Sequence, residues 1–262
     1  ICGWFPGEME VEDLSQMKVV RIRIGRVYQR LFQKITRLDP ISYSLRMWKI
    51  IAREGAAVVH IHNEPKLLAG LLNHMGKDNR PVIVHVANEK PLPQLGLERV
   101  TRWVACSSYI ENWLVQTQRI PRHKVQVIYT GVDATSCRPK WELSRSSRNA
   151  LRKKYGVSSE EASVLVFAGR LVREKGVMEL LDAFDHLRTV FGDTVELLIA
   201  GNVRNSKDPK NEKANYGRAV VERIERSAGV RWVGSLAPAE VHDFLCTGDI
   251  FVMPSLWHDP FP

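Results

Sequence analysis

Several sequence features are missing from this chain of 262 residues, and each absence argues against a class of function. No run of about 18 apolar residues occurs, so we expect no helix that spans a membrane. The four cysteines are too far apart for a Cys-x-x-Cys motif, which argues against zinc or redox chemistry of that kind. We expect buried thiols in a reducing compartment. The short apolar start runs into acidic residues, so no secretory signal is expected.

The charge of the chain is concentrated in one segment. Hydrophobic content of 44% and charged content of 26% are ordinary for a globular protein. The net charge is +9, and the segment from Lys18 to Arg53, with ten basic residues and one acidic residue, carries all of it. A local basic patch predicts a local anionic partner. Because Ile1 comes first and Pro262 last, we expect a fragment at both ends.

Residues 21–38 show the spacing of an amphipathic helix, with Pro40 ending it. Its polar side carries Arg23, Arg26, Arg30, Lys34 and Arg37. Three interpretations remain open: attachment to an anionic membrane surface, docking of an acidic acceptor, or a solvated helix packed on a sheet. Nucleic-acid binding is not expected, because the aromatic residues form no stacking platform.

Strand-like and helix-like segments alternate along the rest of the chain, after a helix expected at residues 41–53. This alternation predicts βαβ units and parallel sheets. The fold class is therefore α/β, with two Rossmann-like doubly wound domains facing a cleft. We place the first domain at residues 1–135, a linker with a first helix at 136–160, and an incomplete second domain at 161–262. The expected strands are 58–61, 82–86, 103–106, 125–128, 164–168, 195–200, 230–233 and 250–253, and the expected helices between them are 66–75, 109–118, 177–190, 216–227 and 238–246.

The first strand of the second domain is followed by a turn suited to a diphosphate. Gly169 allows the backbone to approach a ligand closely. Arg170 can bind two phosphate oxygens at once, and Lys175 adds a compact charge. The helix that follows adds the partial positive charge of its amino terminus. Taken alone, the same residues also suit a solvated loop with two surface cations.

The other strands of this domain end in similar features. Gly201 closes the second strand, and Val233 with Gly234 closes the third, where the backbone could pair with a flat base. The fourth runs into Pro254 and Ser255 and then into residues 257–261. In a parallel sheet these ends share one edge, so they predict a single binding site.

The set AGRLVREKG, LLIAG, VRWVGSL and DIFVMPSLWHDPFP resembles the donor half of GT-B glycosyltransferases of family 4. VIYTGVDATSCRP resembles the interdomain segment of that family, and VVHIHNEPK and VACSSYIENWL resemble its acceptor half. The resemblance covers residues 56–262. It is nearest to bacterial enzymes that build lipopolysaccharide core, capsule or spore-coat polysaccharides.

The resemblance implies roles for residues at the donor site. Arg170 and Lys175, with Gly169, would bind the donor diphosphate, and the base would lie near Gly201, Val233 and Gly234. In the family, two carboxylates eight residues apart hold the sugar and the ribose of the donor. Asp259, a candidate catalytic residue, is at the position of the first, where Glu is usual, and Pro262 stands where the family has Gly. His258, Pro260 and Phe261 complete the donor-sugar loop. The second family carboxylate, eight residues after Asp259, would fall beyond the last residue.

Three histidines lie on the expected strands of the first domain. His60 and His62 are two apart, so they share a face, and His62 with Asn63 ends the strand. His85 lies on the next strand. We expect His60 to lie in the core, and His62 and His85 to be candidate catalytic residues facing the cleft. A zinc site is not expected, because no acidic or cysteine ligand completes it.

The resemblance implies transfer of a sugar, with retention at the anomeric carbon, from a nucleotide-sugar such as a UDP-, GDP- or ADP-sugar to a glycan or lipid-linked acceptor. No cofactor or metal is expected, because cations and a helix dipole would neutralise the leaving diphosphate. The expected location is cytoplasmic, at the inner face of the cell membrane. Alternatives are a GT-B sugar-nucleotide epimerase or phosphorylase, or an inactive sugar-nucleotide-binding protein.

Overall fold

The computed structural model of the chain forms two compact units, Ile1–Thr130 with Pro260–Pro262, and Gly131–Asp259. It describes residues 2–3, 9, 11–15, 17–22, 41–93, 96–135, 137, 139–204, 208, 210–257 and 260. Most of the basic segment predicted as a helix at 21–38 lies outside these residues. Arg21 and Ile22 are described, and they end a β-strand, so the helix prediction is wrong for these two positions.

The first unit contains a parallel sheet of four strands in the order β4-β5-β6-β7. A separate sheet of three strands, in the order β1-β3-β2, precedes it in the chain. In that sheet β2 pairs antiparallel with β3, and β1 pairs parallel with β3. The strands are β1 (Cys2–Gly3), β2 (Val11–Leu14), β3 (Met17–Ile22), β4 (Val59–His62), β5 (Val82–Val86), β6 (Arg102–Ala105) and β7 (Val125–Val127).

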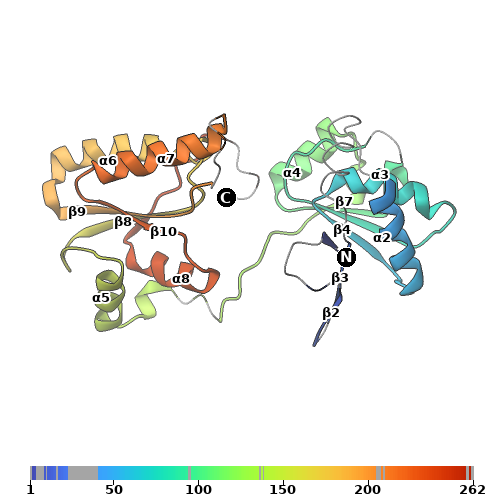
Figure 1. Cartoon of the computed structure of the whole chain (residues 1–262), viewed down its shortest axis with the longest axis horizontal. Coiled ribbons are helices and arrows are strands. Elements are labelled where there is room, and N and C mark those ends of the chain that lie inside the picture. Colours follow the sequence, from blue (N-terminus) through green and yellow to red (C-terminus); the bar gives the residue numbers. More distant parts are fainter. Residues whose placement is uncertain are drawn as a thin grey trace. The chain divides into compact units, whose positions relative to one another are not determined.

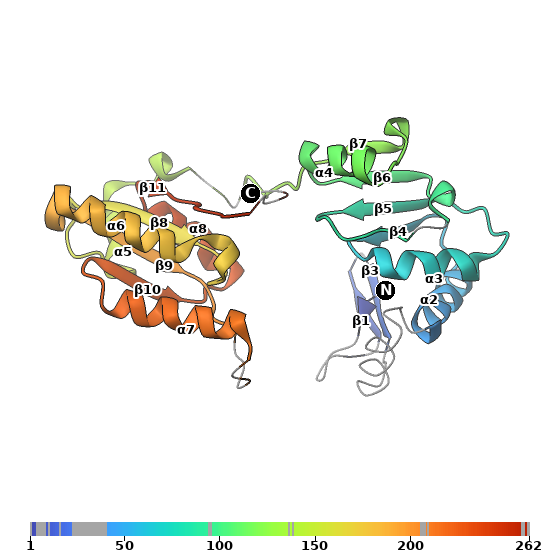
Figure 2. The ribbon, with the colours of Figure 1, turned by 90° about the horizontal axis from the view of Figure 1, so that it is seen from above.

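One face of the four-stranded sheet holds the core of the first unit. Trp103 and Val84 are fully buried there with Leu68 and Leu114 from the helices. Helices α2 and α3 pack together on the sheet (Figure 2). The opposite face carries residues that are exposed or half-buried: His60, His62, Ile83, His85, Arg102, Val104 and Gln126. The helices are α2 (Ile41–Arg53), α3 (Pro65–Met75), η1 (Leu97–Arg99), α4 (Ser108–Asn112), the π-helical η2 (Trp113–Thr117) and η3 (Arg122–Lys124).

The second unit contains a parallel sheet in the order β10-β9-β8-β11. This order is doubly wound, because the chain moves outward from β8 to β10 and then returns to the other side of β8 with β11. The switch point lies between β8 and β11, where such sheets bind ligands at the carboxyl ends of the strands. The strands are β8 (Ser163–Ala168), β9 (Val195–Ala200), β10 (Val230–Gly234) and β11 (Ile250–Phe251).

Helices cover both faces of this second sheet. Figure 1 shows α6 and α7 on one face and α5 and α8 on the other. Phe167 and Leu181 belong to the core beneath α6 and α7. Tyr155 and Phe244 meet edge to face beneath the other pair, with ring centroids 5.3 Å apart. The helices are η4 (Lys140–Glu142), α5 (Arg145–Lys154), η5 (Arg173–Lys175), α6 (Val177–Phe191), η6 (Gly192–Thr194), α7 (Glu212–Glu225) and α8 (Pro238–Thr247).

The predicted α/β class with parallel sheets is confirmed. Within the described part of the chain, no helix is long and apolar enough to cross a membrane. The cysteine prediction holds for Cys106 and Cys246, which are buried, but it is wrong for Cys137, which is exposed.

Candidate functional site

The turn that follows β8 is fixed to the neighbouring strand end by backbone hydrogen bonds. The amide of Gly169 donates to the carbonyl of Ala200 at 2.9 Å, and the amide of Leu171 donates to Asn202 at 3.2 Å. The side chain of Leu171 is fully buried and anchors the turn from below. A β-carbon on Gly201 would lie 1.8 Å from the Gly169 carbonyl oxygen. Glycine is therefore required at position 201, where β9 ends beside the Gly169 carbonyl.

Gly176 joins this turn to the segment that follows β11. It lies at the amino terminus of α6 with a left-handed φ of 66°. A β-carbon there would lie 2.0 Å from the carbonyl oxygen of Pro254. The amide of Leu256 also donates to the carbonyl of Glu174 at 3.0 Å. The two strand ends that flank the switch point are thus held against each other by backbone contacts.

The predicted cations lie around the amino terminus of α6. Arg170 precedes the η5 turn and is exposed, whereas Lys175 is the last residue of that turn and is half-buried. The first turn of a helix presents backbone N–H groups that have no partner within the helix. One of them, the amide of Met178, donates to the Tyr216 hydroxyl at 3.3 Å. Two cations beside a helix amino terminus form a site suited to a phosphate group.

A salt bridge between η5 and α7 was missed by the sequence analysis. Lys213 Nζ lies 2.7 Å from Glu174 Oε1. The hydrogen bond from Lys213, with the charges of Lys213 and Arg170, lowers the pKa of Glu174 below its ordinary value. Glu174 therefore stays ionised and places a third cation beside the turn. The sequence places Glu174 in the REKG turn, but it does not predict the pairing of Glu174 with Lys213, which is 39 residues away.

The ends of β9 and β10 form the part of the site where the sequence predicts the base. The amide of Gly201 donates to the carbonyl of Gly234 at 2.7 Å, and Trp232 Nε1 donates to the Gly201 carbonyl at 2.9 Å. Apart from Gly234 and its chain neighbours, no atom of the described residues lies within 4 Å of a β-carbon built on Gly234, while Val233 is half-buried. The structure thus brings these residues to the same sheet edge as Gly169, as predicted for parallel strands.

The predicted donor-sugar loop is only partly described. His258, Asp259 and Phe261 lie outside the described residues. Pro260 is buried, and its carbonyl accepts a hydrogen bond from the Ser107 hydroxyl within the first unit. Before this loop, the Ser255 hydroxyl is buried with no hydrogen-bond partner in the described part of the chain. Ser255 is thus a further candidate for contacting a donor.

The histidines of the first unit form a cluster on the more open face of the sheet. His62 and His85 are paired in register across β4 and β5, and their ring centroids lie 4.4 Å apart. His60 stacks on His85 at 6.3 Å. Burial, and then the charges of His62 and His60, lowers the pKa of His85 below its ordinary value. His85 is therefore neutral near pH 7, as a group that accepts a proton or a hydrogen bond needs to be.

His60 does not lie in the core, so that prediction is wrong. Its side chain is exposed, because β4 directs its valine and isoleucine toward the helices and its histidines toward the opposite face. His62 is exposed as well and His85 is half-buried. Within the described residues, no group of three or more His, Cys, Asp or Glu side chains is arranged to hold a metal ion.

Polar groups gather where β4 and β5 end. The Asn63 side chain accepts a hydrogen bond from the amide of Ala87 at 3.2 Å, and the Asn63 carbonyl accepts one from Lys90 at 2.7 Å. At these strand ends, the buried atoms His85 Nε2 and Asn88 Oδ1 have no hydrogen-bond partner among the residues described. A buried polar atom usually has a partner, so both are candidates for contacting a ligand. The predicted membrane-side residues Arg23, Arg26, Arg30 and Lys34 lie outside the described residues.

The depressed pKa of His85 predicts how stability changes with pH. The unfolded chain, with a histidine pKa of about 6.5, binds more protons than the folded unit below that pH. The contribution of His85 to stability is therefore complete above about pH 6.5 and is lost as the pH falls through the folded-state pKa. We expect His85→Asn to flatten the dependence of the unfolding free energy on pH, measured by urea unfolding between about pH 7.5 and 5.5.

His186→Asn, at an exposed position on α6, is the control for that measurement and should leave the dependence in the first unit unchanged. NMR titration of the ring protons provides a direct test. A His85 resonance that titrates at or above the ordinary histidine value would contradict the prediction.

The two units define the chain as a protein of two α/β domains with parallel sheets. Comparisons with known proteins identify its family. The family model described as Glycosyltransferase Family 4 matches residues 1–136. The model described as Glycosyl transferases group 1 matches residues 147–262. The chain belongs to the family 4, group 1 glycosyltransferases.

Individual relatives agree with this family. Lipopolysaccharide 1,2-N-acetylglucosaminetransferase of Salmonella typhimurium is 29% identical over 246 residues, which are 92% of this chain and 60% of that protein. Putative glycosyltransferase YtcC of Bacillus subtilis is 26% identical over 212 residues, which are 78% of this chain and 50% of that protein. The crystal structure of a glycosyltransferase from Rickettsia africae has the same fold, with a TM-score of 0.69 at 17% identity, covering 91% of this chain and 60% of that one. The chain thus spans 50–60% of these proteins.

Proposed function

We propose that this chain carries the donor and acceptor sides of a retaining glycosyltransferase. It would transfer a sugar from a UDP-, GDP- or ADP-sugar to a glycan or lipid-linked acceptor in cell-surface polysaccharide synthesis. The observation that carries the proposal is the edge of the second sheet, where Arg170 and Lys175 flank the amino terminus of α6 at the switch point. Backbone contacts of Gly169 and Gly176 fix that edge.

The chemistry proposed for this edge is charge stabilisation. When the bond between the sugar and the diphosphate breaks, negative charge develops on the diphosphate. Arg170, Lys175 and the first turn of α6 would stabilise this charge, with no metal ion required. Because the edge is held by backbone contacts on both sides of the switch point, these donors need little reorganisation during the reaction. Gly201, Val233 and Gly234 would lie beside the base, and Asp259 beside the donor sugar.

The acceptor would bind at the carboxyl ends of β4 and β5. His85 is neutral near pH 7 and has a buried nitrogen without a protein partner in the described part of the chain, so it can accept a hydrogen bond from an acceptor hydroxyl. His62 lies against it and can orient its ring. A lipid-linked acceptor would place the enzyme at the cytoplasmic face of the cell membrane. The basic segment that contains Arg23, Arg26, Arg30 and Lys34 supports such contact by its charge.

A thermal-shift screen with UDP-, GDP- and ADP-sugars tests donor binding. A ligand at about 100 times its Kd should stabilise the second unit by about 2.7 kcal/mol and raise its melting temperature. Incubation with a labelled donor then identifies the product. Transfer to an acceptor with the anomeric configuration retained supports the proposal. Epimerised free donor would favour an epimerase, and binding without turnover an inactive binding protein, while failure of all three donors to bind would overturn the donor site.

A further inference from the structure

Three cations converge on one carboxylate at the amino-terminal edge of the second sheet. Asp249 accepts a hydrogen bond from the Val164 amide at 2.9 Å. The same oxygen, Asp249 Oδ2, lies 2.7 Å from Arg152 Nη2. Lys140 Nζ lies 3.4 Å from Asp249 Oδ1. Arg148 is also paired with Asp249 Oδ1. This group of four side chains therefore has an excess of positive charge.

The carboxylate of Asp249 stays ionised in this group. Burial by itself raises the pKa of Asp249, but the Val164 amide and the charges of Arg152, Arg148 and Lys140 outweigh burial and hold the pKa below its ordinary value. One full negative charge is thus shared by three positive charges. Because its pKa is lowered, Asp249 is not protonated near neutral pH, and the excess of positive charge in the group is retained there.

Two guanidinium nitrogens of the group have no acceptor. Arg148 Nε and Arg152 Nε are both buried without a hydrogen-bond partner in the described part of the chain. Arg152 as a whole is only 5% exposed, and its terminal nitrogens donate to Asp249 and to the carbonyls of Glu160 and Ala162. A buried charged donor without an acceptor is costly, and such groups usually have a partner. The two arginines therefore point to an acceptor that the described chain does not provide.

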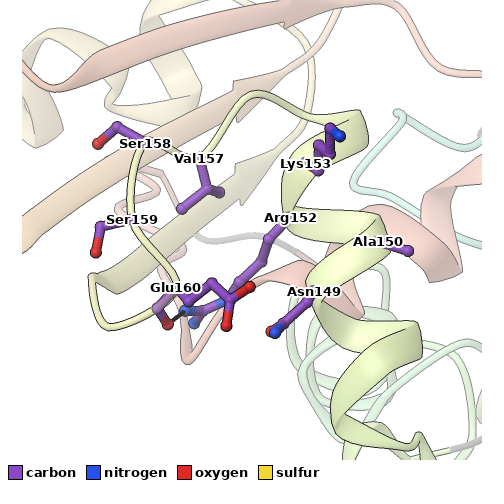
Figure 3. Close-up of a pocket in the computed structure, with 8 residues that line it drawn as sticks. All are labelled: Asn149, Ala150, Arg152, Lys153, Val157, Ser158, Ser159 and Glu160. Carbon is purple, nitrogen blue, oxygen red and sulfur yellow. Dashed lines mark hydrogen bonds between the residues drawn. The ribbon is translucent and has the colours of Figure 1, made fainter.

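Two pockets have Arg152 in their lining, and one of them is also lined by Arg148. The larger has a volume of about 530 Å³ and is lined by Lys140, Trp141, Arg145, Arg148 and Arg152, among others. The smaller, of about 330 Å³, lies between α5 and the loop at Val157–Glu160. Figure 3 shows the smaller pocket, with the Arg152 side chain reaching from α5 toward Glu160. The larger volume is that of a site for a small molecule.

The balance of charge and the exposed ring indicate the kind of ligand. Glu160 and Glu161 also line the larger pocket, and Glu161 pairs with Arg145 at 3.2 Å on the outer rim. The four cations that line the pocket thus face three carboxylates, those of Glu160, Glu161 and Asp249, which leaves an excess of one positive charge. This excess lies at the inner end of the pocket, beside Arg148 and Arg152. Trp141 is 80% exposed and offers an indole surface. A small anion joined to a ring fits both features.

We propose that this pocket binds a small phosphomonoester. The phosphate accepts hydrogen bonds from Arg148 and Arg152, with Lys140 nearby, and a ring joined to the phosphate packs on Trp141. The site is distinct from the donor edge. It adjoins the start of β8, whereas Arg170 follows the end of the same strand, and six residues of strand span about 20 Å. A ligand bound here is therefore an effector and not a reactant.

Calorimetry with inorganic phosphate and phenyl phosphate tests this site. Both probes are titrated into the full chain carrying Lys175→Ala, so that the proposed donor site does not contribute. We expect phenyl phosphate to bind more tightly than inorganic phosphate. Arg148→Gln should weaken both probes about tenfold or more, because a charge-assisted hydrogen bond is lost. Trp141→Ala should remove the preference for phenyl phosphate and leave inorganic phosphate unchanged.

The control variant is Arg226→Gln, which removes one positive charge from an exposed position after α7 and should change neither affinity. Circular dichroism checks that each variant is folded. Should Arg148→Gln fail to fold, Trp141→Ala still decides, because an 80% exposed side chain contributes little to the core. Absence of saturable binding, or equal affinity of both probes in the parent chain and the Trp141→Ala variant, would overturn the proposal. Those results would leave the donor site unaffected.

Discussion

A Lys175→Ala variant is expected to lose at least about 100-fold in affinity for a nucleoside diphosphate, which corresponds to about 2.7 kcal/mol. The reason is the position of Lys175, in the turn between β8 and α6, where the end of β8 and the first turn of α6 meet. Removal of its ammonium group leaves the charge of the diphosphate to Arg170 and the helix terminus. Isothermal calorimetry with UDP, GDP and ADP measures the loss.

Two further variants make this test specific. Arg226→Ala removes an exposed positive charge away from the donor edge and should retain the affinity of the parent chain. Arg170→Lys retains the charge but cannot bind two phosphate oxygens in parallel, so we expect an intermediate loss. Unchanged affinity in Lys175→Ala would show that the diphosphate lies elsewhere, whatever the other two variants do.

A Gly176→Ala variant is expected to destabilise the second unit by about 3 to 5 kcal/mol, because backbone strain and overpacking act at the same position. Gly176 has a left-handed φ of 66°, and the added β-carbon would lie 2.0 Å from the Pro254 carbonyl oxygen. The contact is with backbone, so no side-chain rotation relieves it. The segment after β11 has to move away from α6, and nucleotide affinity should fall along with stability. Urea unfolding measures the stability, and calorimetry measures the affinity.

Gly192→Ala separates the two causes. Gly192, at the other end of α6, also has a positive φ, of 60°, but apart from its chain neighbours no atom in the described part of the chain lies within 4 Å of its β-carbon position. This variant should show only the cost of backbone strain, about 1 to 3 kcal/mol, and should bind nucleotide normally. Equal stability of the two variants would mean that the Pro254 contact imposes no constraint.

The sequence was most informative where strands are buried. The helix at 41–53 and the strands at 82–86 and 195–200 have the predicted boundaries. Both strands are mostly apolar, which is typical of parallel strands covered by helices. The sequence did not predict β1, β2 and β3. Strand β2 is mostly exposed, so its residues lack the pattern that a buried face imposes.

The candidate site was predictable as far as it depends on strand ends. Gly169, Gly201 and Gly234 could be placed on one edge because strand order along the chain and parallel pairing place them there. Contacts between distant residues could not be read from the sequence. The Lys213–Glu174 pair, the contact of Tyr216 with α6 and the burial of the Ser255 hydroxyl all depend on packing between elements far apart in the chain.

The pairing of β11 with β8 has a consequence for the order in which the protein acquires its parts. Strands β8 and β9 are adjacent in the chain and can pair early, whereas the partner of β8 on its other side begins only at Ile250. Bringing β11 back to β8 closes a long loop, which is slow. During synthesis, β11 also cannot pair until the ribosome has produced the chain beyond Ile250. The turn proposed to bind the diphosphate would then remain without Pro254 and Leu256 after most of the helix content has formed. In refolding experiments, recovery of nucleotide binding should therefore lag behind the far-ultraviolet circular dichroism signal.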